Sequence, residues 1–329
     1  MNSFLFSVNA VLPIILMAVI GYFLKRIGLL PPNLAKQLNA LVYRLFLPTM
    51  LFLNVYKIEN FSNMNVLFII YGAVAILFLF FLGIPLSYLY TKEPNRRGVL
   101  IVNGFRSNSA LIGIALASSL FGEEGVQAAS LLSGVSIPIL IVITVITLNI
   151  FGEKKEKVDV RKTILDIIKN PLLIGLFIGF VSLFIRAIFE KCGIGFRFRD
   201  LEVVYTTAES LSSLATPLAL LVLGAQFEFS MVKALKKEIF LGTIQKVIFS
   251  PFLILGAALL LFKNQFSGAE FASLIAFFAT PAAVSSVPMV QETGGDASLA
   301  GQLVVWTTIS SALTLFLFIF FFRSIGILV

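Results

Sequence analysis

Residues 103–113 of this 329-residue chain read NGFRSNSALIG, a polar stretch that lies between two long apolar tracts. It holds two Asn, one Arg, two Ser and two Gly. In a bilayer such groups are costly unless they face protein, water or a substrate. We therefore interpret the sequence around this interruption and around a partner interruption near Thr280-Pro281.

The composition indicates a polytopic helical membrane protein. Hydrophobic residues make up 58% of the chain, charged residues 13%, and the mean hydropathy is +0.99. A soluble domain carries roughly 25% charged residues, and the apolar tracts here reach about twenty residues, the length that crosses a bilayer. The net charge of +8 fits basic loops and requires no nucleic acid partner. The chain has no histidine and one cysteine, which excludes histidine-ligated metals, histidine general bases and an intramolecular disulfide.

The apolar tracts predict ten membrane-spanning helices. With the N-terminus outside and alternating directions, seventeen Lys and Arg residues fall on the inner side and seven on the outer side. Because basic residues gather in cytoplasmic loops, this bias predicts both termini outside, in a plasma membrane of the bacterial type. The predicted helices span residues 4–24, 35–56, 66–90, 98–121, 126–151, 164–189, 203–227, 239–262, 269–291 and 299–322.

The chain also repeats itself. Residues 45–53 read LFLPTMLFL and residues 214–222 read LATPLALLV, and their prolines lie 169 positions apart. Gly122 and Gly294, which follow the two polar helices, lie 172 positions apart. The two similar offsets predict an internal repeat.

Five helices in each half require the halves to be inverted in the membrane. We expect a first repeat at residues 1–151, a charged cytoplasmic linker at 152–163 and a second repeat at 164–329. Inverted repeats with interrupted helices at matching positions are typical of secondary transporters, and the binding site is expected at the interruptions.

The second interruption contains Pro281 and Pro288, seven residues apart. Each proline removes a backbone donor and clashes with the preceding turn, so the fourth and ninth helices are expected to be broken. Unwinding exposes half-helix N-termini, which attract anions, and two crossing breaks would bring such ends together with side-chain donors. The predicted substrate-binding residues are Asn103, Arg106, Asn108, Ser109, Gly113, Thr280, Pro281, Ser285, Ser286 and Pro288, with no catalytic residue and no metal ligand.

Several of these residues allow more than one interpretation. In one interpretation, the breaks only kink two helices, with Ser and Thr satisfying the freed carbonyls. Arg106 would bind substrate, anchor the crossover or snorkel inward, whereas Asn108 is the strongest candidate for direct contact. Lys246 would face a cavity or, the favoured interpretation, snorkel to the inner face. Gln291 is expected to meet water at the inner end of its helix; Lys246 and Gln291 are candidates for coupling or support.

The sequence resembles the auxin efflux carrier family over essentially its whole length. That family includes bacterial malate and malonate permeases and, more distantly, the plant PIN-formed auxin exporters. The residues that carry the resemblance are Val11-Leu12-Pro13-Ile14-Ile15-Leu16, Gly21-Tyr22, Leu38-Asn39-Ala40-Leu41-Val42-Tyr43, Leu47-Pro48, Phe105-Arg106-Ser107-Asn108, Gly113, Pro281-Ala282-Ala283 and Gly294-Gly295-Asp296.

The resemblance implies the all-α inverted-repeat fold of bile acid symporters and sodium/proton antiporters. Helices 1, 2, 6 and 7 would form a scaffold that makes a homodimer, and helices 3–5 and 8–10 a transport domain that moves as an elevator. Asn108 matches the crossover Asn that contacts the substrate carboxylate in the plant relatives. The chain departs from many bacterial members because Ile114, not proline, follows Gly113.

The predicted function is secondary active or facilitative transport of a small organic anion, such as malate, malonate or an auxin-like acid, across the lipid bilayer. Coupling to Na⁺ or H⁺ stays open, and no cofactor is expected. A passive anion channel is the alternative. An enzyme is not predicted, because the sequence shows no constellation of nucleophile and base or of metal ligands.

Overall fold

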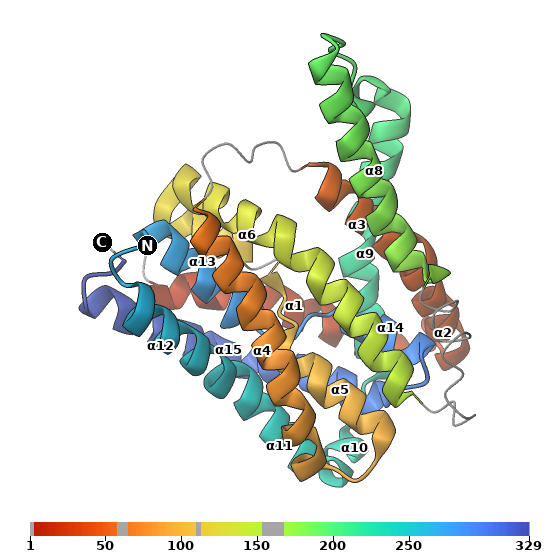
Figure 1. Ribbon diagram of the computed structural model, residues 1–329. Helices are drawn as coiled ribbons and strands as arrows, with labels where there is room; N and C mark the ends of the chain where they lie inside the picture. Colours follow the sequence, from red (N-terminus) through yellow and green to blue (C-terminus); the bar gives the residue numbers. More distant parts are fainter. Residues whose placement is uncertain (1–2, 58–64, 110–112, 153–167, 329) are drawn as a thin grey trace.

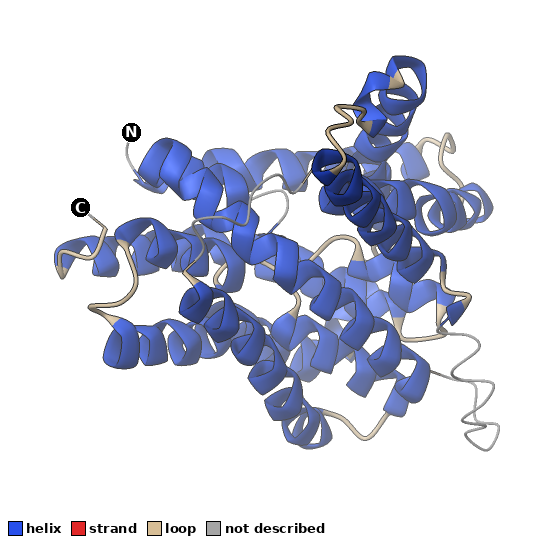
Figure 2. Ribbon diagram, turned by 45° about the horizontal axis from the view of Figure 1, so that its top comes forward, coloured by secondary structure: helices blue, strands red, loops and turns tan. Residues whose placement is uncertain are grey.

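The computed structural model describes residues 3–57, 65–109, 113–152 and 168–328, and within these ranges the regular structure is helical (Figure 2). Seven helical segments in the described ranges are long and apolar enough to span a bilayer. Their lengths, from 21 to 36 residues, exceed the roughly 20 residues that a membrane span needs. The protein is therefore an all-helical, multi-span membrane protein.

The first half of the chain contains a long helix that is bent at one point. Phe121 (φ −135°, ψ 18°) and Gly122 (φ 54°, ψ −131°) leave helical geometry inside α6 and divide it into two helical parts. The described elements are α1 (Ser3–Arg26), α2 (Pro32–Leu41), the π-helical turn η1 (Val42–Phe46), α3 (Leu47–Tyr56), α4 (Val66–Tyr90), α5 (Pro94–Phe105) and α6 (Ile114–Phe151).

The second half is divided more finely. A second π-helical turn, η4, joins two helices just before Pro251. The elements are α8 (Pro171–Lys191), η3 (Phe198–Asp200), α9 (Glu202–Gln226), α10 (Phe229–Ala234), α11 (Lys236–Ile244), η4 (Gln245–Phe249), α12 (Ser250–Phe262), α13 (Gly268–Phe278), α14 (Ser286–Glu292) and α15 (Ala297–Ser324).

The sequence-based boundaries agree with these elements to within a few residues in most places. The predicted start at residue 164 lies outside the described residues, and the described helix in this region, α8, begins at Pro171. Asn170 accepts a hydrogen bond from the N–H of Leu172 and caps the helix, and proline at its first position lacks the N–H that would otherwise be unpaired. The predicted linker lies outside the described residues, except for Gly152.

Glycines allow two pairs of helices to approach closely. A Cβ atom on Gly224 of α9 would lie 1.8 Å from the carbonyl oxygen of Ala18 in α1. One on Gly175 of α8 would lie 2.4 Å from the carbonyl oxygen of Pro48 in α3. Small residues at such contacts drive helix association in lipid, where the hydrophobic effect does not. Figure 1 shows α3, α8 and α9 together at one side of the molecule and α4, α11, α12 and α15 at the other.

Two apolar helices are interrupted. α5 ends at Phe105 and the next helix begins at Ile114, while α13 ends at Phe278 and α14 begins at Ser286. The predicted positions of both breaks are confirmed, although residues 110–112 lie outside the described part.

Candidate functional site

The two interruptions bind each other through their backbones. The N–H of Asn108 donates to the carbonyl oxygen of Pro281 at 2.8 Å, within an antiparallel bridge between Ser107 and Ala282. The N–H of Ala282 donates to the Thr307 hydroxyl of α15 at 3.1 Å. Since non-helical backbone at membrane depth has to find partners inside the protein, these bonds make the breaks stable.

A cavity of about 200 Å³ lies against this junction. Its walls come from α3, from both interruptions, from the second part of α6 and from α9. The polar side chains in the wall are Asn54, Arg106, Ser107, Asn108, Ser109, Thr216 and Ser285, and the apolar ones include Met50, Leu51, Ile137, Leu140 and Ile141. The cavity combines mostly apolar walls with a few convergent polar groups, which is typical of a small-molecule site.

Arg106 is buried in the cavity wall and is only 6% exposed, so the snorkelling interpretation is wrong. Its Nη2 donates to the hydroxyl of Ser285 and its Nη1 to the sulfur of Met289, both at 2.9 Å, so it anchors one interruption to the other. These bonds use two of the five guanidinium N–H donors. In the described ranges no carboxylate lies within ion-pair distance of Arg106.

Lys246 is the second buried basic residue. It lies in η4, is 1% exposed, and its Nζ donates to the Ser107 hydroxyl at 2.5 Å. The favoured interpretation that it snorkels to the inner face is wrong. Lys246 contacts the cavity through Ser107, and the described residues again provide no carboxylate partner.

Asn108 contributes a donor that has no partner. Its side-chain Nδ2 is buried and makes no hydrogen bond within the described structure, although the residue lines the cavity. A buried amide without a partner is costly, by about 1–3 kcal/mol. Asn108 Nδ2 and the N–H groups of Arg106 that Ser285 and Met289 do not use are therefore donors for a ligand in the cavity.

Comparison of the sequence with known proteins identifies the family of the chain. The membrane transport protein family matches residues 6–319. The chain belongs to this family of membrane transporters, the auxin efflux carrier family. An uncharacterized transporter of Methanocaldococcus jannaschii is 29% identical over 248 residues, covering 73% of this chain and 74% of that protein. Another, from Methanothermobacter thermautotrophicus, is 23% identical over 319 residues, 95% of this chain and 97% of that protein.

The structure brings Arg106, Asn108, Ser109 and Ser285 of this transporter together at the cavity. The other predicted residues lie elsewhere. Asn103 donates to the Gly242 carbonyl at 2.8 Å, the Thr280 hydroxyl donates to the Ala276 carbonyl at 3.1 Å, and Gln291 accepts from Gln226 at 3.2 Å. Gly113 packs against α13, and Pro281, Ser286 and Pro288 are buried beside the cavity without lining it.

The helix-end argument for anion binding does not hold at α14. The N–H groups of Ser286 and Val287 already donate to the carbonyls of Ala283 and Val284, at 3.0 and 3.1 Å. The prediction of free N–H groups at this end is therefore wrong for its first two residues. The positively charged group in the cavity wall is the side chain of Arg106.

Sequence reasoning missed the wall that lies opposite the interruptions. Asn54 and Thr216 come from α3 and α9, the two helices that carry the repeated proline motif. Thr216 directly precedes the second of those prolines, and Asn54 is a polar residue within an apolar tract. The polar residues near those two prolines were the sequence signal that could have predicted this wall of the cavity.

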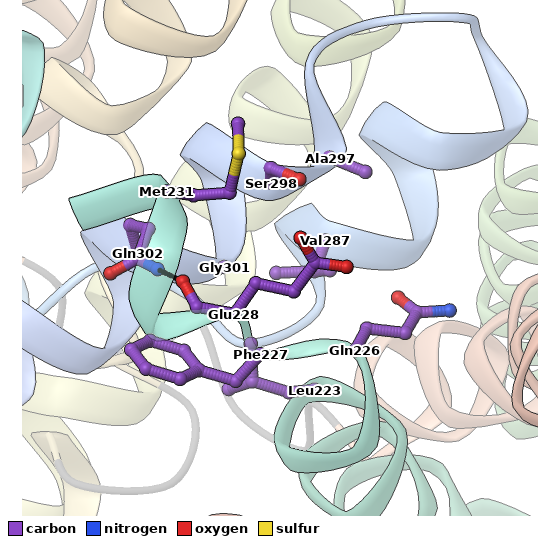
Figure 3. A pocket seen from close by; sticks show the side chains of 10 residues that line it. All are labelled: Leu223, Gln226, Phe227, Glu228, Met231, Val287, Ala297, Ser298, Gly301 and Gln302. Carbon is purple, nitrogen blue, oxygen red and sulfur yellow. Dashed lines mark hydrogen bonds between the residues drawn. The ribbon is translucent and has the colours of Figure 1, made fainter. Parts of the chain in front are cut away.

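A second pocket lies between the end of α9, α10, α14 and α15 (Figure 3). Its floor includes a hydrogen bond of 2.9 Å from Gln302 to the backbone carbonyl of Glu228. With a volume of about 10 Å³, it holds no more than about one water molecule. It is too small for a carboxylate substrate.

Proposed function

We propose that this transporter carries a small organic anion, which binds in the cavity beside Arg106 and Asn108. The observation that carries the proposal is the burial of Arg106 and Lys246 without a carboxylate partner in the described ranges. Isolated buried charges are costly, and intramembrane ionisable residues mark substrate pathways. An anionic substrate would provide the missing countercharge.

The donors favour a carboxylate. A guanidinium binds a carboxylate in a planar, often bidentate geometry, and such charge-assisted bonds are roughly twice as strong as neutral ones. Arg106 has donors left over, and Asn108 offers an unpaired Nδ2. Malate, malonate or an auxin-like acid has the charge and the size for such a site. The apolar wall from α3 and α6 would select among them.

The architecture of two inverted five-helix repeats, ten helices in all, is part of the proposal. Two observations support it. α1 packs on α9, and α8 packs on α3, through glycines. In each contact the first helix of one repeat meets the second helix of the other repeat. A two-fold axis that relates the repeats would convert one contact into the other. Gly122 and Gly294 have positive φ angles of 54° and 75° at equivalent places after the broken helices.

For alternating access, the helices would fall into two groups that each take elements from both repeats. The elements α1 to α3, α8 and α9 would form a static, dimeric scaffold, while α4 to α6 and α11 to α15, with the crossover, would move as an elevator. The cavity lies between these two groups, with Asn54 and Thr216 on the scaffold side. Two contacts that join the groups would break during the movement: Arg44–Glu292 at 3.3 Å and Gln226–Gln291 at 3.2 Å.

The test is transport in proteoliposomes made with the purified protein. Radiolabelled mono- and dicarboxylates are offered with and without a sodium or pH gradient, and exchange is measured with unlabelled substrate on the opposite side. A carrier shows saturable uptake that increases with substrate on the opposite side. Ohmic single-channel currents would establish the passive channel instead. Dependence on either gradient identifies the coupling ion.

The variant Asn108→Ala tests the site itself, and we expect it to abolish uptake while expression and folding persist. Asn149→Ala is the matched control, because the side chain of Asn149 in α6 donates to the carbonyl of Val145 in its own helix, at 2.8 Å, and does not line the cavity. Uptake by Asn108→Ala at the wild-type rate would refute the proposed site.

The orientation with both termini outside a plasma membrane is tested by labelling Cys192 from either side, since it is exposed and follows α8.

A further inference from the structure

A larger, apolar cavity lies away from the polar one. It has a volume of about 370 Å³ and is enclosed by α1, by the end of α9 with α10, and by α15. Its walls include Val19, Tyr22, Phe229, Trp306 and Ile309. The volume lies within the range of about 300–1,000 Å³ that is usual for sites of small molecules.

This cavity opens on the surface that faces the membrane. Val19 is 41% exposed, Ile309 46%, Trp306 37% and Phe229 67%. In a membrane protein, exposed apolar side chains of spanning helices lie against acyl chains. The cavity is therefore accessible from the bilayer, and its walls match an acyl chain in polarity.

A positive charge lies at one edge of the cavity. Arg26, at the end of α1, donates from Nη2 and Nε to the hydroxyl of Tyr22, at 2.6 and 3.0 Å, and its Cζ lies 5.2 Å from the centre of that ring. Tyr22 itself lines the cavity and packs edge-to-face on Phe229 at 5.6 Å. Arg26 is exposed and, among the residues that the structure describes, has no carboxylate partner.

We propose that this cavity binds an anionic phospholipid, with an acyl chain between α1, α9 and α15 and its phosphate at Arg26. The neighbouring Lys25 adds a second positive charge to the same helix end. Guanidinium groups bind phosphate oxygens in a fork geometry, and clusters of basic residues at the end of a membrane helix attract anionic lipids. The site is independent of the transported anion.

Charge favours a lipid over a second copy of the chain as the occupant. A two-fold contact pairs the same patch on both subunits. If it were centred on this cavity, it would bring the Lys25 and Arg26 ends of both α1 helices together, and this helix end carries no acidic residue to compensate them. A phospholipid instead matches both the apolar wall and the charge.

Trp306 gives a direct readout, because it is the single tryptophan of the chain and it lines the cavity. The full chain is reconstituted into vesicles of phosphatidylcholine and phosphatidylglycerol at a fixed ratio, and one of the two lipids carries brominated acyl chains. Bromine quenches tryptophan fluorescence on contact. Lipids that merely surround the protein quench according to their mole fractions, whereas a site that selects anionic lipid departs from them.

We expect brominated phosphatidylglycerol to show about fivefold higher affinity for the Trp306 site than brominated phosphatidylcholine, the factor that one basic residue contributes near an anionic headgroup. Arg26→Gln should reduce this preference to what Lys25 alone contributes. Lys263→Gln, which removes a positive charge at the end of α12, should retain it. High salt should also weaken the wild-type preference, which provides a second measurement if Arg26→Gln does not fold.

Three results would overturn the proposal. Equal quenching by both lipids in the wild type would show that the cavity does not select an anionic headgroup. An unchanged preference in Arg26→Gln would show that the phosphate does not bind there. Absence of quenching by either lipid would show that something other than lipid, such as a second copy of the chain, covers Trp306.

Discussion

The substitution Arg106→Met should separate anion binding from the stability of the empty protein. Methionine retains much of the length of the side chain and removes the charge. An anion in the cavity would lie about 4 Å from the guanidinium, where two unit charges attract by about 4 kcal/mol at an effective dielectric constant of 20. Measured hydrogen bonds to charged groups contribute about 1.5–3 kcal/mol, so we expect a loss of about 2–3 kcal/mol.

That loss corresponds to a rise of about 30- to 150-fold in the KM for the transported anion. The empty protein should not lose stability to the same degree, because the substitution also removes a buried charge that has no carboxylate partner in the described ranges. The assays are uptake by proteoliposomes for the KM and thermal unfolding in detergent for the empty protein.

Ser285→Ala is the matched control. It removes the hydroxyl that accepts from Arg106 at 2.9 Å but leaves the charge in place. If Arg106 only anchors the crossover, both variants should reduce uptake equally. A wild-type KM in Arg106→Met, or equal effects of the two substitutions, would refute the assignment of Arg106 to the anion. Arg106→Lys, which retains the charge without the fork, should give an intermediate KM.

Two further predictions follow from single contacts. Lys246→Met should raise the KM for the anion and also raise the unfolding temperature of the empty protein, because it removes a buried amine whose described contact is one hydroxyl. Lys236→Met, at an exposed position in the preceding helix α11, should change neither. Gly224→Ala should lower the unfolding temperature or the folded yield, because its Cβ would clash with the Ala18 carbonyl oxygen at 1.8 Å, whereas Gly256→Ala meets nothing within 4 Å and should be neutral or stabilising by up to about 1 kcal/mol. A tolerated Gly224→Ala would show that α1 and α9 separate more easily than their packing indicates.

The positions of the two breaks were predictable because their causes are local. Proline removes a donor wherever it lies in a helix, and clusters of Gly, Ser and Asn stand out against apolar sequence. The membrane class was predictable for a similar reason, since hydropathy over about twenty residues needs no tertiary information. The start of α8 at Asn170-Pro171 also had a local signal, which the hydropathy-based boundary overrode.

The environment of Lys246 was not predictable in the same way. The direction in which the Lys246 side chain points depends on the π-helical turn η4. A π-helical turn contains one extra residue and so rotates the side chains that follow it. Asn54 and Thr216 were missed because they reach the cavity only through the packing of α3 and α9 beside the two interruptions. These are tertiary facts, and a polar residue in an apolar helix more often joins helices than binds substrate.

The bond between the two interruptions also has a consequence for how the protein is made. Arg106 and the residue that accepts its hydrogen bond, Ser285, are 179 positions apart in the chain. During synthesis the first interruption therefore enters the membrane long before its partner exists, with a guanidinium and unpaired amides in the bilayer. Until α13 and α14 are inserted, α5 has to remain near water, lipid headgroups or the insertion machinery. A nascent chain that stops before Pro281 would carry this polar segment without the partners that the second interruption provides.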